Sequence, residues 1–169
     1  MKKKKPFVLL EQDYKDLINI FIEEKVQFIL VGGYAVGLHG HPRATKDLDL
    51  WVYANSKNAR LVVKSLVRFG APMQDISVQD FETEGTILQI GVEPVRIDIT
   101  TKVAGLKFKE AIKNVKMIKI EELDIPTISL QDLIKNKKAS GRYRDLDDVE
   151  SLEKILERNK NTFINAPLP

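Results

Sequence analysis

Two aspartates separated by one leucine, Asp47 and Asp49, are the residues with the clearest chemical capacity in this sequence. Alternate residues of a β-strand point to the same face, so a strand here would present both carboxylates on one side. Aspartate is disfavoured in strands, and neighbouring negative charges repel each other. A cation such as Mg²⁺ would offset that cost, because it binds carboxylate oxygens and keeps coordination positions free for phosphates. A solvent-facing edge strand that carries two acids is the alternative.

A third aspartate, Asp98, interrupts a second run of β-forming residues, Val95 to Ile99. If this strand lies beside the first, three carboxylates meet on one patch, as two-metal phosphoryl or nucleotidyl transfer requires. Two cations would hold a triphosphate, and the third acid would bridge a metal or accept the proton of the attacking hydroxyl. A simple ion pair between Asp98 and Arg96 is the alternative.

Two glycines, Gly32 and Gly33, lie between an apolar run and a short helical segment. Glycine lets another group approach the backbone closely, and a helix start offers free N–H groups. Both properties suit phosphate oxygens, whereas an ordinary turn is the alternative.

A basic and then acidic stretch extends from Lys135 to Asp148. Lys137 or Arg142 could neutralise the charge of a triphosphate, although a solvated basic face is the alternative. The acids that follow, among them Asp145, are explained by the favourable effect of negative charge at a helix start. We expect Lys137 to be hydrated in the ligand-free protein, so that its removal would change stability little.

Two further pairs of residues attract attention. His39 and His41 flank a glycine in a loop, and we interpret them as structural or solvent-facing, since three acids already suffice for a metal. Trp51 and Tyr53 continue the alternation of the acidic strand. They could stack on a base or an acceptor ring, but packing in the core is the favoured interpretation.

Hydrophobic periodicity predicts the elements that must position these residues. Helices are predicted at residues 11–25, 34–38, 58–69, 129–139 and from 146 to about 159. Strands are predicted at 26–31, 47–53, 86–91, 95–99, 115–120 and 125–128. The strands at 86–91 and 95–99 should form a hairpin, and the last two should be short edge strands. This alternation indicates an α/β (α+β) protein.

Composition sets the outer bounds. A chain of 169 residues with 43% hydrophobic and 30% charged residues is typical of a globular protein. The absence of cysteine excludes disulfides and thiolate metal sites and favours a cytoplasmic protein. No apolar run approaches the roughly 20 residues that a membrane span needs. We expect a basic tail at residues 1–10, and one domain at 11–160 with its core at 26–128 and C-terminal helices at 129–160.

Together these residues carry a resemblance. The glycine pair, a spacer of 13 residues, the sequence Asp47-Leu48-Asp49-Leu50 and the later strand with Asp98 are similar to the signature of the DNA polymerase β-like nucleotidyltransferase superfamily. The segment from Arg43 to Asp49 resembles its minimal bacterial and archaeal branch, which neighbours the AbiEii-type abortive-infection toxins. The segment 137–148 also resembles that group, and the resemblance covers residues 26–152.

The resemblance implies a small mixed β-sheet flanked by helices, one or two Mg²⁺ ions and a nucleoside triphosphate (NTP) donor. The reaction implied is transfer of a nucleoside monophosphate to a hydroxyl of a protein, an RNA end or a small molecule. The matched positions imply that Asp47 and Asp49 hold the metals, that Asp98 is the third ligand or base, and that Lys137 lies near the donor. The implied nucleotide-binding residues are Gly32, Gly33, Arg43, Thr45, Arg142 and Asp145.

Two matters stay open at this stage. AbiEii-type toxins usually have a longer C-terminal helical region than this chain, so a toxin–antitoxin role, with an antitoxin or other small helical protein as partner, is one expectation among several. The second class is a catalytically silent nucleotide-binding or interaction module on the same fold. Retention of all three acids favours the enzyme.

Overall fold

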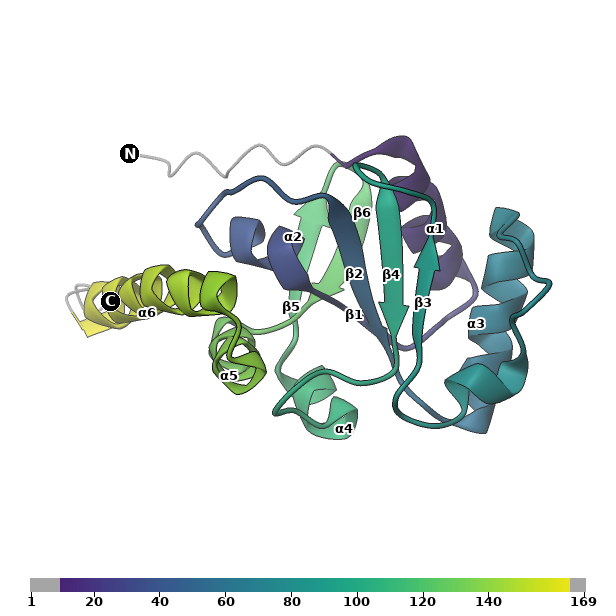
Figure 1. The fold of residues 1–169 in the computed structure, drawn as a ribbon. Helices are drawn as coiled ribbons and strands as arrows, with labels where there is room; N and C mark the ends of the chain where they lie inside the picture. The colour runs from purple at the N-terminus through teal and green to yellow at the C-terminus, as the bar shows by residue number, and fades with distance from the viewer. Residues whose placement is uncertain (1–9, 165–169) are drawn as a thin grey trace.

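A six-stranded mixed β-sheet with helices on both faces forms the protein in a computed structural model that describes residues 10–164 (Figure 1). The strands are β1 (Phe28–Val31), β2 (Asp47–Val52), β3 (Ile87–Ile90), β4 (Arg96–Thr100), β5 (Lys116–Ile120) and β6 (Leu123–Thr127). The α-helices are α1 (Gln12–Glu23), α2 (Gly32–Leu38), α3 (Ser56–Phe69), α4 (Phe108–Ala111), α5 (Leu130–Ser140) and α6 (Tyr143–Ile164). Two short 3₁₀ helices are η1 (Val78–Phe81) and η2 (Ile112–Asn114).

The strand order is β3-β4-β2-β1-β6-β5. β2 pairs antiparallel with β1 and parallel with β4, and β1 pairs parallel with β6. The predicted hairpin is present as the antiparallel pair β3 and β4. The fold class and mixed sheet are therefore as predicted. The prediction that residues 125–128 form an edge strand is wrong, because β6 pairs with β1 on one side and β5 on the other.

Alternation along β2 separates two hydrophobic cores. Leu48 and Leu50 are fully buried in the core that packs against α1 and α3, whereas Trp51 is buried on the opposite face among residues of α2, α4, α5 and α6. Figure 1 shows α1 and α3 on one side of the sheet and α4, α5 and α6 on the other. Because Asp47 and Asp49 share the face of Trp51 by alternation, they point toward the side covered by the C-terminal helices.

Several predicted boundaries shift in the structure. The last helix extends from Tyr143 to Ile164 rather than from 146 to 159, because its first turn is polar and shows no apolar periodicity. The short helix α2 already includes both glycines. Leu10, which we assigned to the basic tail, is buried in the first core, and the rest of that tail lies outside the described residues. Within residues 10–164 no helix is both long and apolar enough to cross a bilayer.

One buried amide fixes α3 to the sheet. The side chain of Asn58, which is 2% exposed, accepts a hydrogen bond from the backbone N–H of Gln27 at 2.8 Å. Its amide nitrogen donates to the carbonyl oxygens of Gln27 at 3.0 Å and Tyr53 at 2.9 Å. Asn58 therefore links the chain before β1 and after β2 to the start of α3.

We expect Asn58→Ala to lower the free energy of unfolding by about 2–4 kcal/mol, because it leaves several buried backbone groups without partners. Urea unfolding monitored by circular dichroism measures the change. Asn55→Ala is the control, since it removes only the side chain that caps α3 and should cost about 1 kcal/mol. Equal losses from both variants would contradict the linking role of Asn58.

Candidate active site

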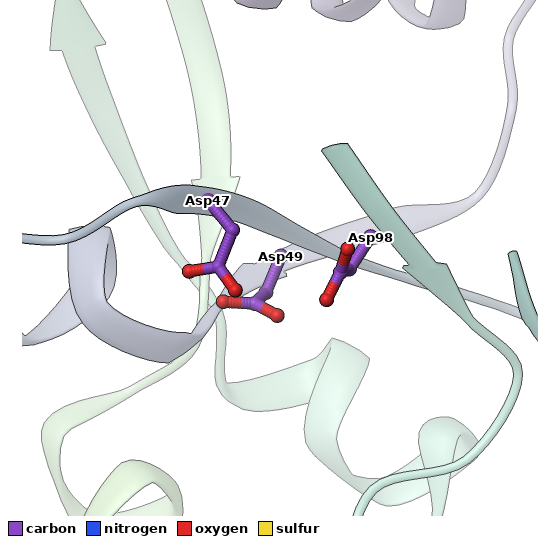
Figure 2. A group of neighbouring side chains, drawn as sticks. All are labelled: Asp47, Asp49 and Asp98. Carbon is purple, nitrogen blue, oxygen red and sulfur yellow. The ribbon is translucent and has the colours of Figure 1, made fainter. Parts of the chain in front are cut away.

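The parallel pairing of β2 with β4 brings the three aspartates together. In this register Asp49 is the partner of Asp98, and Asp47 is the partner of Arg96. One carboxylate oxygen from each of Asp47, Asp49 and Asp98 lies within 4.8 Å of the other two. Figure 2 shows the three side chains projecting to the same side of the two strands. The predicted convergence of the acids is therefore present.

All ten predicted site residues line one cavity of about 620 Å³. The acids belong to its wall together with the following residues: Gly32, Gly33, Arg43, Thr45, Lys137, Arg142 and Asp145. The cavity also includes residues that we did not predict, among them Arg96, Lys102 and Arg144. The structure thus collects the predicted set in one place, while the role of each residue stays a prediction.

Gly32 makes room for an acid. It has a φ of +71°, which favours glycine, and a Cβ atom added there would lie 2.1 Å from Oδ2 of Asp49. A Cβ atom added to Gly33 would lie 2.7 Å from the hydroxyl oxygen of Thr45. The hydroxyl of Thr45 lies in hydrogen-bond range of two acceptors of Asp47, the backbone carbonyl oxygen at 3.2 Å and Oδ1 at 3.3 Å. The glycine pair therefore permits the start of α2 to pack closely against β2, which carries Asp49, and against the loop before β2.

A buried ion-pair network joins α5 and α6 to the loop before β2. The Lys137 ammonium lies 2.7 Å from Oδ1 of Asp145 and 3.1 Å from Oδ2 of Asp148. Asp148 also accepts two hydrogen bonds of 2.9 Å from the guanidinium of Arg43, and Asp145 accepts one of 2.9 Å from Arg142. Although burial acts to raise it, the hydrogen bonds from Lys137 and Ser140 lower the pKa of Asp145.

This network corrects two expectations. Lys137 is 6% exposed and paired with two acids, so the expectation that it is hydrated is wrong. Asp145 and Asp148 are buried partners of cations rather than exposed acids that merely complement a helix dipole. Periodicity misses both features, because Lys, Asp and Arg are ordinarily placed at the surface unless a partner for each is known.

Arg96, one of the cavity residues that we did not predict, contacts two of the acids. Its Nε atom donates to Oδ1 of Asp98 at 2.8 Å, and its Nη2 atom donates to Oδ2 of Asp98 at 3.1 Å and to Oδ2 of Asp47 at 2.8 Å. The ion pair proposed as an alternative for Asp98 is therefore present together with the cluster of acids. Its position two residues before Asp98 on a strand was the available signal, since both side chains share one face.

The surroundings of Asp49 strongly shift its acid–base equilibrium. Burial raises the pKa of Asp49 to about 7, the negative charges of Asp47 and Asp98 add to this effect, and Lys137 and Arg96 oppose it. Three closely spaced carboxylates, one of which is costly to ionise, form a set of hard oxygen ligands. These residues fit a divalent cation such as Mg²⁺.

The remaining candidates lie outside this cluster. Trp51 is 1% exposed and packs edge-to-face on Phe108 with ring centroids 5.1 Å apart, and Tyr53 stacks on the same ring at 5.0 Å. The favoured interpretation of core packing is thus confirmed for Trp51. His39 lies with Nε2 2.7 Å from the carbonyl oxygen of Ile128, and burial lowers its pKa. Neither histidine belongs to the acid group, the one potential metal cluster found within residues 10–164.

We expect Asp49→Asn to stabilise the metal-free protein at pH 8 by about 1–3 kcal/mol. The pKa of Asp49 is about 7 in the folded protein and 3.8 in the reference state, so between these values the folded chain keeps a proton that the unfolded chain has lost. Stability should therefore fall as pH rises from about 4 to 7, and the substitution should remove this fall. Urea unfolding in EDTA at pH 5 and pH 8 measures it. Asp147→Asn, at an exposed acid of α6, should leave the pH dependence unchanged.

We expect Lys137→Met to lower the free energy of unfolding by about 3 kcal/mol or more, because it leaves two buried carboxylates short of a partner. Lys138→Met is the matched control on the same helix. Lys138 pairs with Glu153 at the surface, so its loss should cost less than about 1 kcal/mol. Similar midpoints for both variants in thermal melts would show that the network contributes little.

Comparisons with known proteins agree with this geometry. A family model described as "Nucleotidyltransferase of unknown function (DUF6036)" matches residues 7–159. No curated protein matches the chain.

Solved structures share the fold at low sequence identity. A provisionally assigned nucleotidyltransferase from Thermotoga maritima has a TM-score of 0.56 and 14% identity, covering 89% of this chain and 96% of its own. The lincosamide antibiotic adenylyltransferase LnuA, with lincomycin bound, has a TM-score of 0.57 and 16% identity, covering 87% and 98%. The antibiotic-resistance factor ANT(2'')-Ia has a TM-score of 0.53 and 11% identity, covering 90% and 91%.

These structural likenesses establish the fold. The family match extends over most of the sequence and includes every residue of the cavity described above. The chain therefore belongs to the family described as nucleotidyltransferases of unknown function.

Proposed function

We propose that this protein transfers a nucleoside monophosphate from an NTP to a hydroxyl group, with Mg²⁺ bound by Asp47, Asp49 and Asp98. The observation that carries the proposal is the meeting of three carboxylates within 4.8 Å on one wall of the cavity. Such a cluster of like charges is costly without a cation, and phosphate oxygens complete the coordination of Mg²⁺ well.

The reaction joins the acceptor oxygen to the α-phosphorus of the donor. The bond between that phosphorus and the oxygen of the β-phosphate breaks, and pyrophosphate leaves. Bound Mg²⁺ supplies charge neutralisation at the phosphates. We propose that Asp98 either accepts the proton of the acceptor hydroxyl or is the third metal ligand, because it comes from a different strand than Asp47 and Asp49.

The surrounding residues would position the donor. We assign the phosphates to the side of Gly32 and Gly33, because both glycines line the cavity at the start of α2, where backbone N–H groups suit phosphate oxygens. Thr45 would keep Asp47 in place through its hydroxyl. An ammonium has three N–H donors, and Lys137 donates one hydrogen bond to Asp145 while Oδ2 of Asp148 lies 3.1 Å away as an ion-pair partner. We assign a further N–H of Lys137 to a phosphate oxygen in the cavity.

The basic groups of the cavity support an anionic donor. Arg43 and Arg142 line the same cavity. Arg43 lies in the loop before β2 and pairs with Asp148, and Arg142 lies just before α6 and pairs with Asp145, so both acids come from α6. We assign both arginines, with Asp145, to the nucleotide side of the site. Pairing fixes their side chains before the donor arrives, which reduces the ordering cost of binding.

For the acceptor we propose three classes: a small molecule, an RNA end or a protein. LnuA is an adenylyltransferase of a lincosamide antibiotic, which makes a small hydroxylated molecule a reasonable first acceptor class to test. A role in a toxin–antitoxin or abortive-infection system, with an antitoxin or another small helical protein as partner, is supported by the resemblance of segments 43–49 and 137–148 to AbiEii-type toxins.

A catalytically silent nucleotide-binding module is the alternative function. The same ion-pair network would serve a purely structural role in such a protein. Because all three acids are present and converge, the active enzyme is the function that the geometry supports better.

Calorimetric titration with ATP and with the other NTPs tests the proposal. We expect binding that requires Mg²⁺ and that Asp49→Asn weakens by about 10²-fold or more, since one of the three carboxylates that would hold the metal is removed. Asp147→Asn, which removes an exposed acid from α6, is the control and should bind as the parent protein does. Binding that is equally strong without Mg²⁺ would favour the silent module.

Activity is then tested with labelled NTPs and cell extract. The parent protein should transfer label to one class of acceptor, and Asp98→Asn should reduce transfer by at least about 10²-fold while the protein stays folded. Metal-dependent NTP binding without any transfer, across all four NTPs, would contradict the transferase and leave the silent module.

A further inference from the structure

Arg96 already occupies the position between two of the acids. Its Nη2 atom lies 2.8 Å from Oδ2 of Asp47 and 3.1 Å from Oδ2 of Asp98, so a single nitrogen bridges the carboxylates of two neighbouring strands. The Nε atom holds the other oxygen of Asp98 at 2.8 Å. The guanidinium thus makes from β4 the same bridge that a divalent cation would make.

A cation and this guanidinium compete for one place. Mg²⁺ binds carboxylate oxygens at about 2.0–2.1 Å, and an Nη2 atom within 3.1 Å of the same oxygens would lie against it. Two positive charges at such a separation repel each other strongly in a partly buried site. Only Asp49, among the three acids, receives no hydrogen bond from a cation within the described residues, so Asp47 and Asp98 are the ligands that Arg96 covers.

A further acid, Glu93, lies near the guanidinium of Arg96. Glu93, in the turn between β3 and β4, has its Oε1 atom 3.7 Å from Nη1 of Arg96. Its side chain is 49% exposed and also lies 3.3 Å from the ammonium of Lys46. Rotation of the arginine toward this turn would therefore exchange one carboxylate partner for another without leaving the cavity, since Glu93 is part of its wall.

We propose that Arg96 is an internal counterion that the divalent cation displaces from Asp47 and Asp98, and that Glu93 receives it. The inference rests on the metal site of the proposed function. Its consequence is that a cation alone binds weakly, because it must first break the arginine bridge. A cation that arrives with a triphosphate brings added attraction, so nucleotide and metal should bind cooperatively.

Titration with Mn²⁺ in the absence of nucleotide tests the proposal, with calorimetry and the electron paramagnetic resonance signal of free Mn²⁺ as readouts. We expect Arg96→Gln to bind Mn²⁺ about tenfold more tightly than the parent protein, because the competing charge is gone. Lys102→Gln is the matched control, since it removes one positive charge from the same cavity but none that bridges the acids. Its Mn²⁺ affinity should change by less than about threefold.

A double-mutant cycle isolates the role of Glu93. Glu93→Gln should weaken Mn²⁺ binding in the parent protein, where Arg96 needs a new partner. In the Arg96→Gln background, the same substitution should change Mn²⁺ affinity only by the small effect of removing one negative charge. Equal effects of Glu93→Gln in both backgrounds would overturn the assignment of Glu93 as the receiving acid.

Thermal melts provide a second measurement that does not depend on affinity alone. Without metal, Arg96→Gln should melt below the parent protein, because Asp47 and Asp98 lose the cation that they share. Saturating Mn²⁺ should raise its midpoint more than that of the parent. An Mn²⁺ affinity of Arg96→Gln that is equal to or lower than that of the parent would mean that Arg96 stays beside the acids and orients them. That result would overturn the proposal that the cation displaces Arg96. If Asp49→Asn binds Mn²⁺ as tightly as the parent protein does, the metal site itself is wrong, and the proposed function is wrong with it.

Discussion

The parallel register between β2 and β4 is the constraint on which the rest of this site depends. It places Asp49 beside Asp98 and Asp47 beside Arg96, all on one face of the sheet. A shift of one residue would turn one set of side chains into the hydrophobic core, where Leu48 now lies. The register is held by that core, so the same alternation that buries the leucines also gathers the charges.

A second constraint couples the loop before β2 to the helices α5 and α6. Asp148 of α6 accepts hydrogen bonds from Arg43 in the loop before β2, and Lys137 of α5 forms ion pairs with both Asp148 and Asp145. A network of this kind is worth little unless every member is satisfied, and here each buried carboxylate has at least two donors. The helices at the C-terminal end of the described chain are therefore part of the cavity rather than an appendage to it.

Sequence reasoning was sufficient where a local pattern reports a local fact. The alternation around Asp47 and Asp49, and the apolar run around Asp98, predicted two strands with acids on one face, because period-two patterns depend only on neighbouring residues. It was insufficient for Lys137, whose burial depends on acids eight and eleven positions away, and for the interior position of β6, whose neighbours are set by the whole sheet. Arg96 was seen only as a possible partner of one acid, since its second contact comes from a strand 49 residues distant.

The contact between Arg43 and Asp148 spans 105 residues. During synthesis, at about 5–20 residues per second, the acids of β2 and β4 leave the ribosome well before the helix that fixes the loop beside them. A nascent chain can thus form its sheet while the cavity still lacks one wall. The completed pocket arises only when α6, which carries Asp145 and Asp148, has emerged.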